Sequence, residues 1–111
     1  MTIRDIINLL NSVDDSMPMI GVGTNFDSAW GASCLTVVPE DIEELTVSDF
    51  IESLELAITK DYEGYKGGEF SMDDTVNLYV ADYGDYGSIV TGVEITKVAD
   101  IIGIKLKTEY N

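Results

Sequence analysis

Carboxylates in a short glycine-rich stretch are the first residues of this chain that could do chemistry. Residues 81–92 read ADYGDYGSIVTG, so that Asp82 and Asp85 each precede a Tyr-Gly pair. Calcium prefers six to eight oxygen ligands, whereas this stretch offers two carboxylates beside backbone carbonyls and the Ser88 hydroxyl. Glycine and aspartate are also typical of tight turns between strands. We therefore interpret residues 82–87 as a hairpin connection, with a weak divalent-cation site as the alternative.

Residues that usually carry out catalysis are scarce. The sequence has no histidine, which removes the usual general base and the commonest metal ligand. Cys34 stands in an apolar run, where we expect a buried strand residue and not a nucleophile. GVGTNF at 21–26 has neither the spacing nor the lysine of a phosphate-binding loop. Paired carboxylates are abundant, but none is marked by an apolar setting that would raise its pKa. We expect no catalytic, cofactor-binding or dedicated metal-binding residues, and therefore no enzyme.

Charge is the strongest compositional feature. Twenty-one acids face six bases among 111 residues, for a formal net charge of −15. No base stands between Arg4 and Lys60, whereas eleven acids do. Such a polyanion repels nucleic acid and anionic membranes and is attracted to basic surfaces or cations. We therefore expect no direct binding of nucleic acid or membranes; the acids either serve solubility alone or recognise a basic protein surface.

The stretch from Glu40 to Glu63 is the best candidate for such recognition. Asp49, Glu52 and Glu55 are spaced by three along an expected helix, which places their Cβ atoms about 5–6 Å apart. Duplex DNA carries one charge per about 1.7 Å of its axis, so this helix could offer carboxylates where a partner expects phosphates. An ordinary solvated helix face is the alternative. The candidate partner-binding residues are Glu43, Glu44, Asp49, Glu52, Glu55, Asp61, Glu63, Asp82 and Asp85. Aromatic anchors could come from Trp30, Tyr62, Tyr65, Tyr83 and Tyr86.

Two similar segments predict the helices. TIRDIINLL at 2–10 aligns without a gap with TVSDFIESL at 46–54, and both begin with the Thr-x-x-Asp signal of a helix start. Apolar residues then recur three and four positions apart, which predicts amphipathic helices over residues 2–12 and 47–61. We expect both helices to pack on one face of a sheet through Ile7, Leu10, Ile51 and Leu54.

Segments rich in β-forming residues follow each helix. DDSMPMIGV at 14–22 resembles DDTVNLYVA at 73–81, and CLTVV at 34–38 takes the place of VEITKV at 93–98. A last strand alternates, with Ile102, Ile104 and Leu106 expected to face inward. The sequence thus predicts one α+β domain over residues 1–111, with two helices on an antiparallel sheet of about five strands. The repeat indicates a duplicated α-β-β unit, covering residues 1–41 and 46–111, or else a coincidence.

The two ends of the chain carry a resemblance. The helical opening MTIRDIINLLNS and the β-rich ending GIKLKTEYN, together with the acidity, resemble small phage- and prophage-encoded proteins. Within that group the chain is similar to anti-CRISPR inhibitors of the type II nuclease, several of which are acidic, non-enzymatic mimics of DNA. The resemblance implies binding to a basic DNA-binding surface of a CRISPR effector nuclease.

The same resemblance implies a cytoplasmic location in a bacterial host. The single Cys34 cannot form an internal disulfide, and no apolar run approaches the roughly 20 residues of a membrane span. The alternative function is a phage accessory or structural protein, whose acids give only solubility and whose sheet mediates assembly. Exposed sheet edges in such a fold also allow a homodimer.

Overall fold

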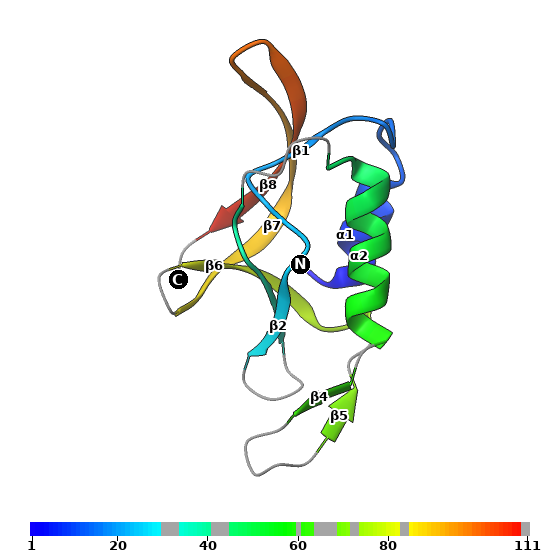
Figure 1. Ribbon diagram of the computed structural model, residues 1–111, viewed down its shortest axis with the longest axis vertical. Coiled ribbons are helices and arrows are strands. Elements are labelled where there is room, and N and C mark those ends of the chain that lie inside the picture. The colour runs from blue at the N-terminus through cyan, green and yellow to red at the C-terminus, as the bar shows by residue number, and fades with distance from the viewer. Residues whose placement is uncertain are drawn as a thin grey trace.

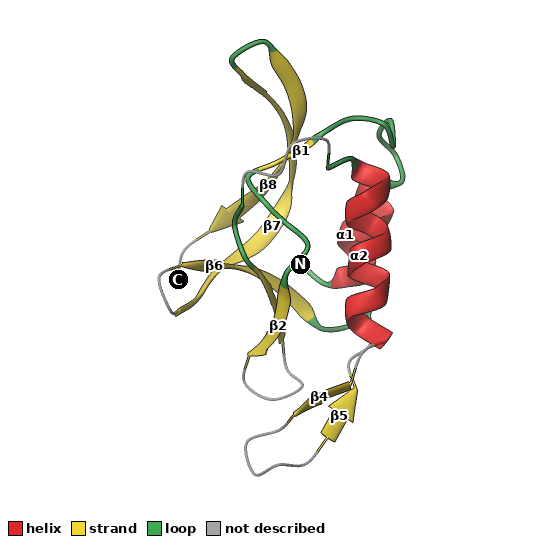
Figure 2. Ribbon diagram, viewed as in Figure 1, coloured by secondary structure: helices red, strands yellow, loops and turns green. Residues whose placement is uncertain are grey.

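The computed structural model describes residues 1–29, 34–40, 45–59, 61–63, 69–71, 74–82 and 85–109; for residues 28–29, 61–63, 69–71, 82 and 85–86 it describes the backbone alone. Helices α1 (Ile3–Leu10) and α2 (Val47–Thr59) lie side by side against one side of a curled sheet (Figures 1 and 2). The predicted α+β class and both predicted helices are confirmed.

The main sheet has six strands: β1 (Met19–Ile20), β2 (Phe26–Ala29), β3 (Cys34–Val37), β6 (Asn77–Asp82), β7 (Asp85–Val98) and β8 (Ile101–Glu109). Their order is β1-β8-β7-β6-β3-β2, and a separate two-stranded sheet consists of β4 (Asp61–Glu63) and β5 (Glu69–Ser71). The pairs β1–β8 and β3–β6 are parallel, and the other neighbours are antiparallel. The prediction of an antiparallel sheet of about five strands therefore fits only in part, because the sheet has six strands and is mixed.

The parallel pair β3–β6 follows from the position of α2 in the chain. Parallel neighbours need a long crossover, usually through a helix, and α2 lies between β3 and β6. The alignment of the two repeats also implied that residues 14–22 and 34–38 form a hairpin like β6 and β7. Instead β1 pairs with β8, and β3 pairs with β2 and β6. In the main sheet an antiparallel pair comes later in the chain than each helix, β2–β3 after α1 and β6–β7 after α2. The duplication stays a prediction.

The start of α1 is held by its own cap and by the strand region beside it. The Thr2 hydroxyl accepts a hydrogen bond from the Asp5 amide at 3.2 Å, as the sequence signal predicts. Amides of the first helical turn have no partner within a helix. Here Ile3 N donates to the Val76 carbonyl and Arg4 N to the Asp74 carbonyl, both at 2.9 Å. The helix therefore begins with its first amides satisfied, and its start is held against the segment just before β6.

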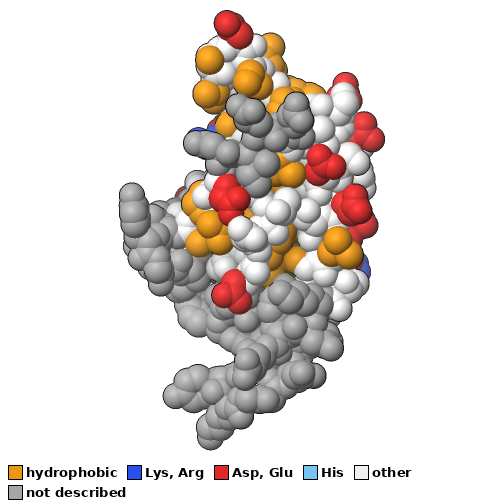
Figure 3. All heavy atoms as spheres, in the orientation of Figure 1, with side chains coloured by type: hydrophobic (Ala, Val, Ile, Leu, Met, Phe, Trp, Pro, Cys, Tyr) orange, Lys and Arg blue, Asp and Glu red, His pale blue; other side chains and the backbone are white. Residues whose placement is uncertain are grey.

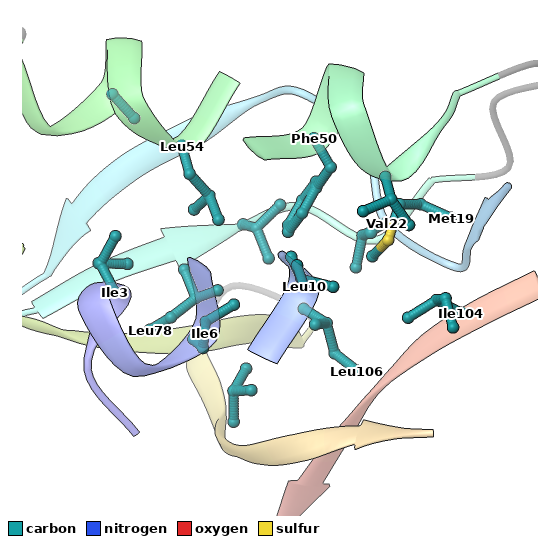
Figure 4. Close-up of a cluster of buried hydrophobic side chains, with 14 of the residues drawn as sticks. Ile3, Ile6, Leu10, Met19, Val22, Phe50, Leu54, Leu78, Ile104 and Leu106 are labelled. Carbon is teal, nitrogen blue, oxygen red and sulfur yellow. The ribbon is translucent and has the colours of Figure 1, made fainter. Parts of the chain in front are cut away.

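One apolar core fills the space between the helices and the sheet (Figure 4). Leu10 and Leu54 are fully buried, and Ile7 and Ile51 pack partly buried against the same cluster, as predicted. The rings of Phe26 and Phe50 lie with their centroids 6.0 Å apart. The core consists of Ile3, Ile6, Leu10, Met19, Val22, Leu35, Val37, Leu45, Val47, Phe50, Leu54, Ala57, Leu78, Val90, Ile104 and Leu106.

The long hairpin of β7 and β8 extends beyond this core. Ile104 and Leu106 are buried as predicted, but the prediction that Ile102 faces inward is wrong, because its side chain is 55% exposed. Alternation along a strand determines which face a side chain is on, and not whether anything covers that face. In Figure 1 the tip of the hairpin projects past both helices, so that no helix covers Ile102 there.

The DYGDYG stretch forms a hairpin connection, as predicted. Asp82 and Asp85 are opposite one another at the ends of β6 and β7. Gly87 has the expected positive φ, +87°, but it lies within β7 and not in the turn. The register gives β7 two residues opposite the single Ala81, which is a β-bulge. A Cβ at Gly87 would meet the Val80 carbonyl.

We expect Leu54→Ala to lower the free energy of unfolding by about 2–5 kcal/mol, because it leaves a cavity in the core. Leu56→Ala on the same helix is the control, since Leu56 is 64% exposed and its loss should cost under ~0.5 kcal/mol. Chemical denaturation of the two variants checks this. Equal costs would contradict the placement of α2.

We expect Gly87→Ala to destabilise the protein more than Gly21→Ala. Both glycines have positive φ, +87° and +81°, but a Cβ at Gly21 meets nothing within 4 Å. Gly21→Ala should thus cost only the backbone strain, roughly 1–2 kcal/mol, and Gly87→Ala should add a steric clash of about 1–3 kcal/mol. Melting temperatures of the two variants measure the difference, and a lower melting temperature for Gly21→Ala would contradict the bulge.

Candidate functional site

The acids of α2 are the best-described part of the predicted binding surface. Asp49, Glu52 and Glu55 are all exposed, on a helix whose opposite face is buried through Phe50 and Leu54. Figure 3 shows acidic side chains along the side of the molecule that the helices form. The structure therefore brings these three predicted residues together on one solvent-facing side.

Asp49 has a structural role in addition. The Thr46 amide donates to a carboxylate oxygen of Asp49 at 3.1 Å, and the Asp49 amide donates to the Thr46 hydroxyl at 3.1 Å. This reciprocal pair is a capping box. Because one carboxylate oxygen of Asp49 is engaged, Glu52 and Glu55 are better candidates for contacting a partner. Among the described residues, neither glutamate has a hydrogen-bond or ion-pair partner.

Two further acids lie beside the start of α2, and sequence analysis did not include them in the site. The Ser48 amide donates to the Asp15 carbonyl at 3.0 Å, and the Val47 amide donates to the Met17 carbonyl at 2.8 Å. The preceding Asp14 accepts from the Ser16 amide and hydroxyl at 2.9 and 2.7 Å, and the backbone hydrogen bond is the main cause that lowers the pKa of Asp14. The sequence DDS at 14–16 signals such a turn, but only the fold brings the turn to α2.

The one described base on the helices is paired. The Arg4 guanidinium donates to both carboxylate oxygens of Asp74, at 2.8 and 2.9 Å. The two side chains are 62% and 32% exposed, and an ion pair of this kind contributes about 0.2–1 kcal/mol. Its larger effect is on charge. Because Asp74 neutralises Arg4, Arg4 does not compensate the negative charge of the acids on α2.

The structure describes no side chain for the other six predicted acids, so it does not place their carboxylates relative to those of α2. Glu43 and Glu44 lie outside the described residues. Asp61 and Glu63 begin and end β4, just after α2. Asp82 and Asp85 flank the β6–β7 turn, and Figure 1 shows β6 running away from the helices toward that turn. Of the predicted aromatic anchors, Tyr62 lies in β4 and Tyr86 in β7, and neither side chain is described; the others, Trp30, Tyr65 and Tyr83, lie outside the described residues.

The net negative charge belongs to the greater part of the chain, and the segment that contains the hairpin tip is neutral. Residues 1–90 hold 18 acids and 3 bases, and residues 91–111 hold 3 of each. The first part thus carries the whole net charge of −15, and the second part is neutral. The described portions of the chain contain no group of three or more His, Cys, Asp or Glu side chains that could hold a metal ion. None of the described helices is long and apolar enough to cross a membrane.

Cys34 is buried in β3, as predicted, and burial raises the pKa of its thiol. The reactive thiolate is therefore disfavoured in the folded protein.

We expect native Cys34 to react slowly with a thiol probe near neutral pH and quickly in denaturant, because unfolding exposes the thiol and restores its ordinary pKa. The ratio of the two labelling rates measures this protection. Equally fast labelling in both conditions would contradict a buried structural role.

Comparisons with known proteins add no family. No family model matches the sequence, and neither characterised proteins nor solved structures yield a match.

Proposed function

We propose that this protein is a non-enzymatic inhibitor that places the acids of α2 on a basic nucleic-acid-binding surface of a host defence nuclease, as a mimic of DNA. The observation that supports it best is the pair Glu52 and Glu55, exposed and without a described partner on a helix fixed to the core. The partner class that we propose is a type II CRISPR nuclease, on the strength of the resemblance in the sequence.

The geometry of α2 suits such contacts. Asp49 and Glu55 are six residues apart, so that the acids span about 9 Å of helix at 1.5 Å per residue. Neighbouring carboxylates are then about as widely separated as the charges along a nucleic-acid strand. The helix is rigid before binding, because the capping box holds its start and Phe50 and Leu54 hold its inner face. Little conformational entropy is therefore lost when the acids meet basic side chains.

An apolar side chain stands among these acids. Leu56 is 64% exposed, and it lies four residues after Glu52 and one after Glu55. Interfaces usually combine a buried apolar centre with a polar rim. We propose that Leu56 is the apolar contact of this surface and that Glu52 and Glu55 provide its charged rim.

We expect Glu52→Lys and Glu55→Lys each to weaken binding to a guide-loaded type II nuclease by more than about tenfold, which corresponds to about 1.4 kcal/mol, because like charges then meet. Glu109→Lys is the matched control, since it makes the same charge change at an exposed position at the end of β8. Binding should also weaken as ionic strength rises past about 0.15 M, where the Debye length is about 8 Å.

Titrations with the nuclease alone and with its DNA already bound measure both effects. Pre-bound DNA should block binding. The mimic mechanism is wrong if all three variants bind alike, or if pre-bound DNA leaves the affinity unchanged. Asp49→Lys is unsuitable here, because loss of the cap would itself lower stability by about 0.5–2 kcal/mol.

A further inference from the structure

The tip of the β7–β8 hairpin exposes a group of large apolar side chains. Ile95, Val98, Ile101 and Ile102 are each more than half exposed, between 54% and 68%. The register places Lys97 opposite Ile102 and Val98 opposite Ile101, so Ile95 and Ile102 are on one face and Val98 and Ile101 on the other. The tip is therefore apolar on both faces, which is typical of a surface that another molecule covers.

The outer edge of β7 is also open. The register of β6 against β7 ends at Ile89, and the terminal ammonium of Met1 donates to the Val90 carbonyl at 2.9 Å. From residue 91 to residue 98, β7 pairs with β8 alone, and no other described backbone group bonds to this edge. Such an edge presents unpaired amides and carbonyls to any strand that can approach.

The outer edge of β8 is blocked at the same level. The Ile104 amide donates to the Pro18 carbonyl at 2.8 Å, and β1 pairs with Ile104 and Lys105. Gly103 is so tightly covered that a Cβ there would lie 2.6 Å from the Pro18 carbonyl oxygen. At residues 103–105 the described chain therefore leaves only the β7 edge of this hairpin open.

We propose that a second copy of this chain covers this edge, with the two β7 strands pairing antiparallel about a twofold axis at Ile95. A strand that pairs with its own copy about a twofold axis gives an isologous contact, and the middle of residues 91–98 is its centre. The charge distribution favours this occupant. Residues 91–111 hold three acids and three bases, so two hairpins meet without like-charge repulsion.

The lysines of this segment also argue against a basic partner surface, such as that of the proposed function, as the molecule that covers the β7 edge. Lys97, Lys105 and Lys107 are three of the six bases in the chain, and they would meet further positive charge. The hairpin also projects from one end of a molecule whose extents are 47 × 25 × 22 Å (Figure 1). Pairing there keeps the two acidic bodies far apart. This inference is independent of the proposed function.

The dimer should be measured by sedimentation over a series of protein concentrations at low and high salt. We expect association in the micromolar range, because the contact is smaller than a standard interface. It should strengthen with salt, since screening reduces repulsion between two bodies of charge −15. Binding to a basic partner has the opposite salt dependence, so failure of one proposal is distinguishable from failure of the other.

Ile95→Lys should abolish the dimer. Leu56→Lys is the matched control, because it adds the same charge at a side chain of similar exposure, 64% against 68%, and it should leave the dimer intact. The proposal is wrong if the wild-type protein stays monomeric at all concentrations. The same holds if the monomer binds neutral lipid vesicles instead. It is also wrong if the Ile95→Lys variant dimerises like the wild type.

A disulfide test locates the contact. Ile95→Cys should form a linked dimer on mild oxidation much faster than Leu56→Cys, because position 95 lies near the axis. Buried Cys34 should not compete. Equal rates for the two variants, or no crosslink in either, would show that the β7 edge is not the interface.

Discussion

Burial of apolar side chains between the two helices and the curled sheet must hold together a chain whose charges repel one another. A net charge of −15 on 111 residues favours expansion of the chain, and the opposing force comes from apolar surface removed from water. The described ion pair, Arg4 with Asp74, is too exposed to contribute much. The acids are consequently on the outside of α2, because Phe50 and Leu54 must be on the inside.

Long-range backbone contacts determine the position of α2 and therefore of its acids. The amides at the start of α2 are satisfied by carbonyls of Asp15 and Met17, and β1, which follows that turn, pairs with β8 near the other end of the chain. The start of α2 and the edge of β8 are thus connected through one short segment, residues 15–20. This segment blocks the β8 edge and leaves β7 open, so that the acidic side and the open edge follow from the same arrangement.

The features that sequence analysis predicted correctly are those with local signals. The Thr-x-x-Asp pattern and the apolar spacing locate both helices, and the apolar run around Cys34 predicts its burial. The parallel pairs could not be predicted, because the pairing of Met19 with Ile104 depends on residues far apart in the chain. Exposure of Ile102 was missed for a similar reason: its alternation is correct, but what covers a strand depends on where the helices end.

For the candidate site, the spacing of Asp49, Glu52 and Glu55 was sufficient to place them on one exposed side, but not to distinguish their roles. Asp49 is in a cap, whereas the two glutamates are free of described partners. If both proposals hold, the two α2 helices of the dimer would act as one ligand. A bivalent ligand gains avidity only where both surfaces can be engaged at once. The distance between the two α2 helices across the twofold axis of the dimer would then favour a partner with two basic surfaces, or two partner molecules. A partner with one narrow basic groove would be disfavoured.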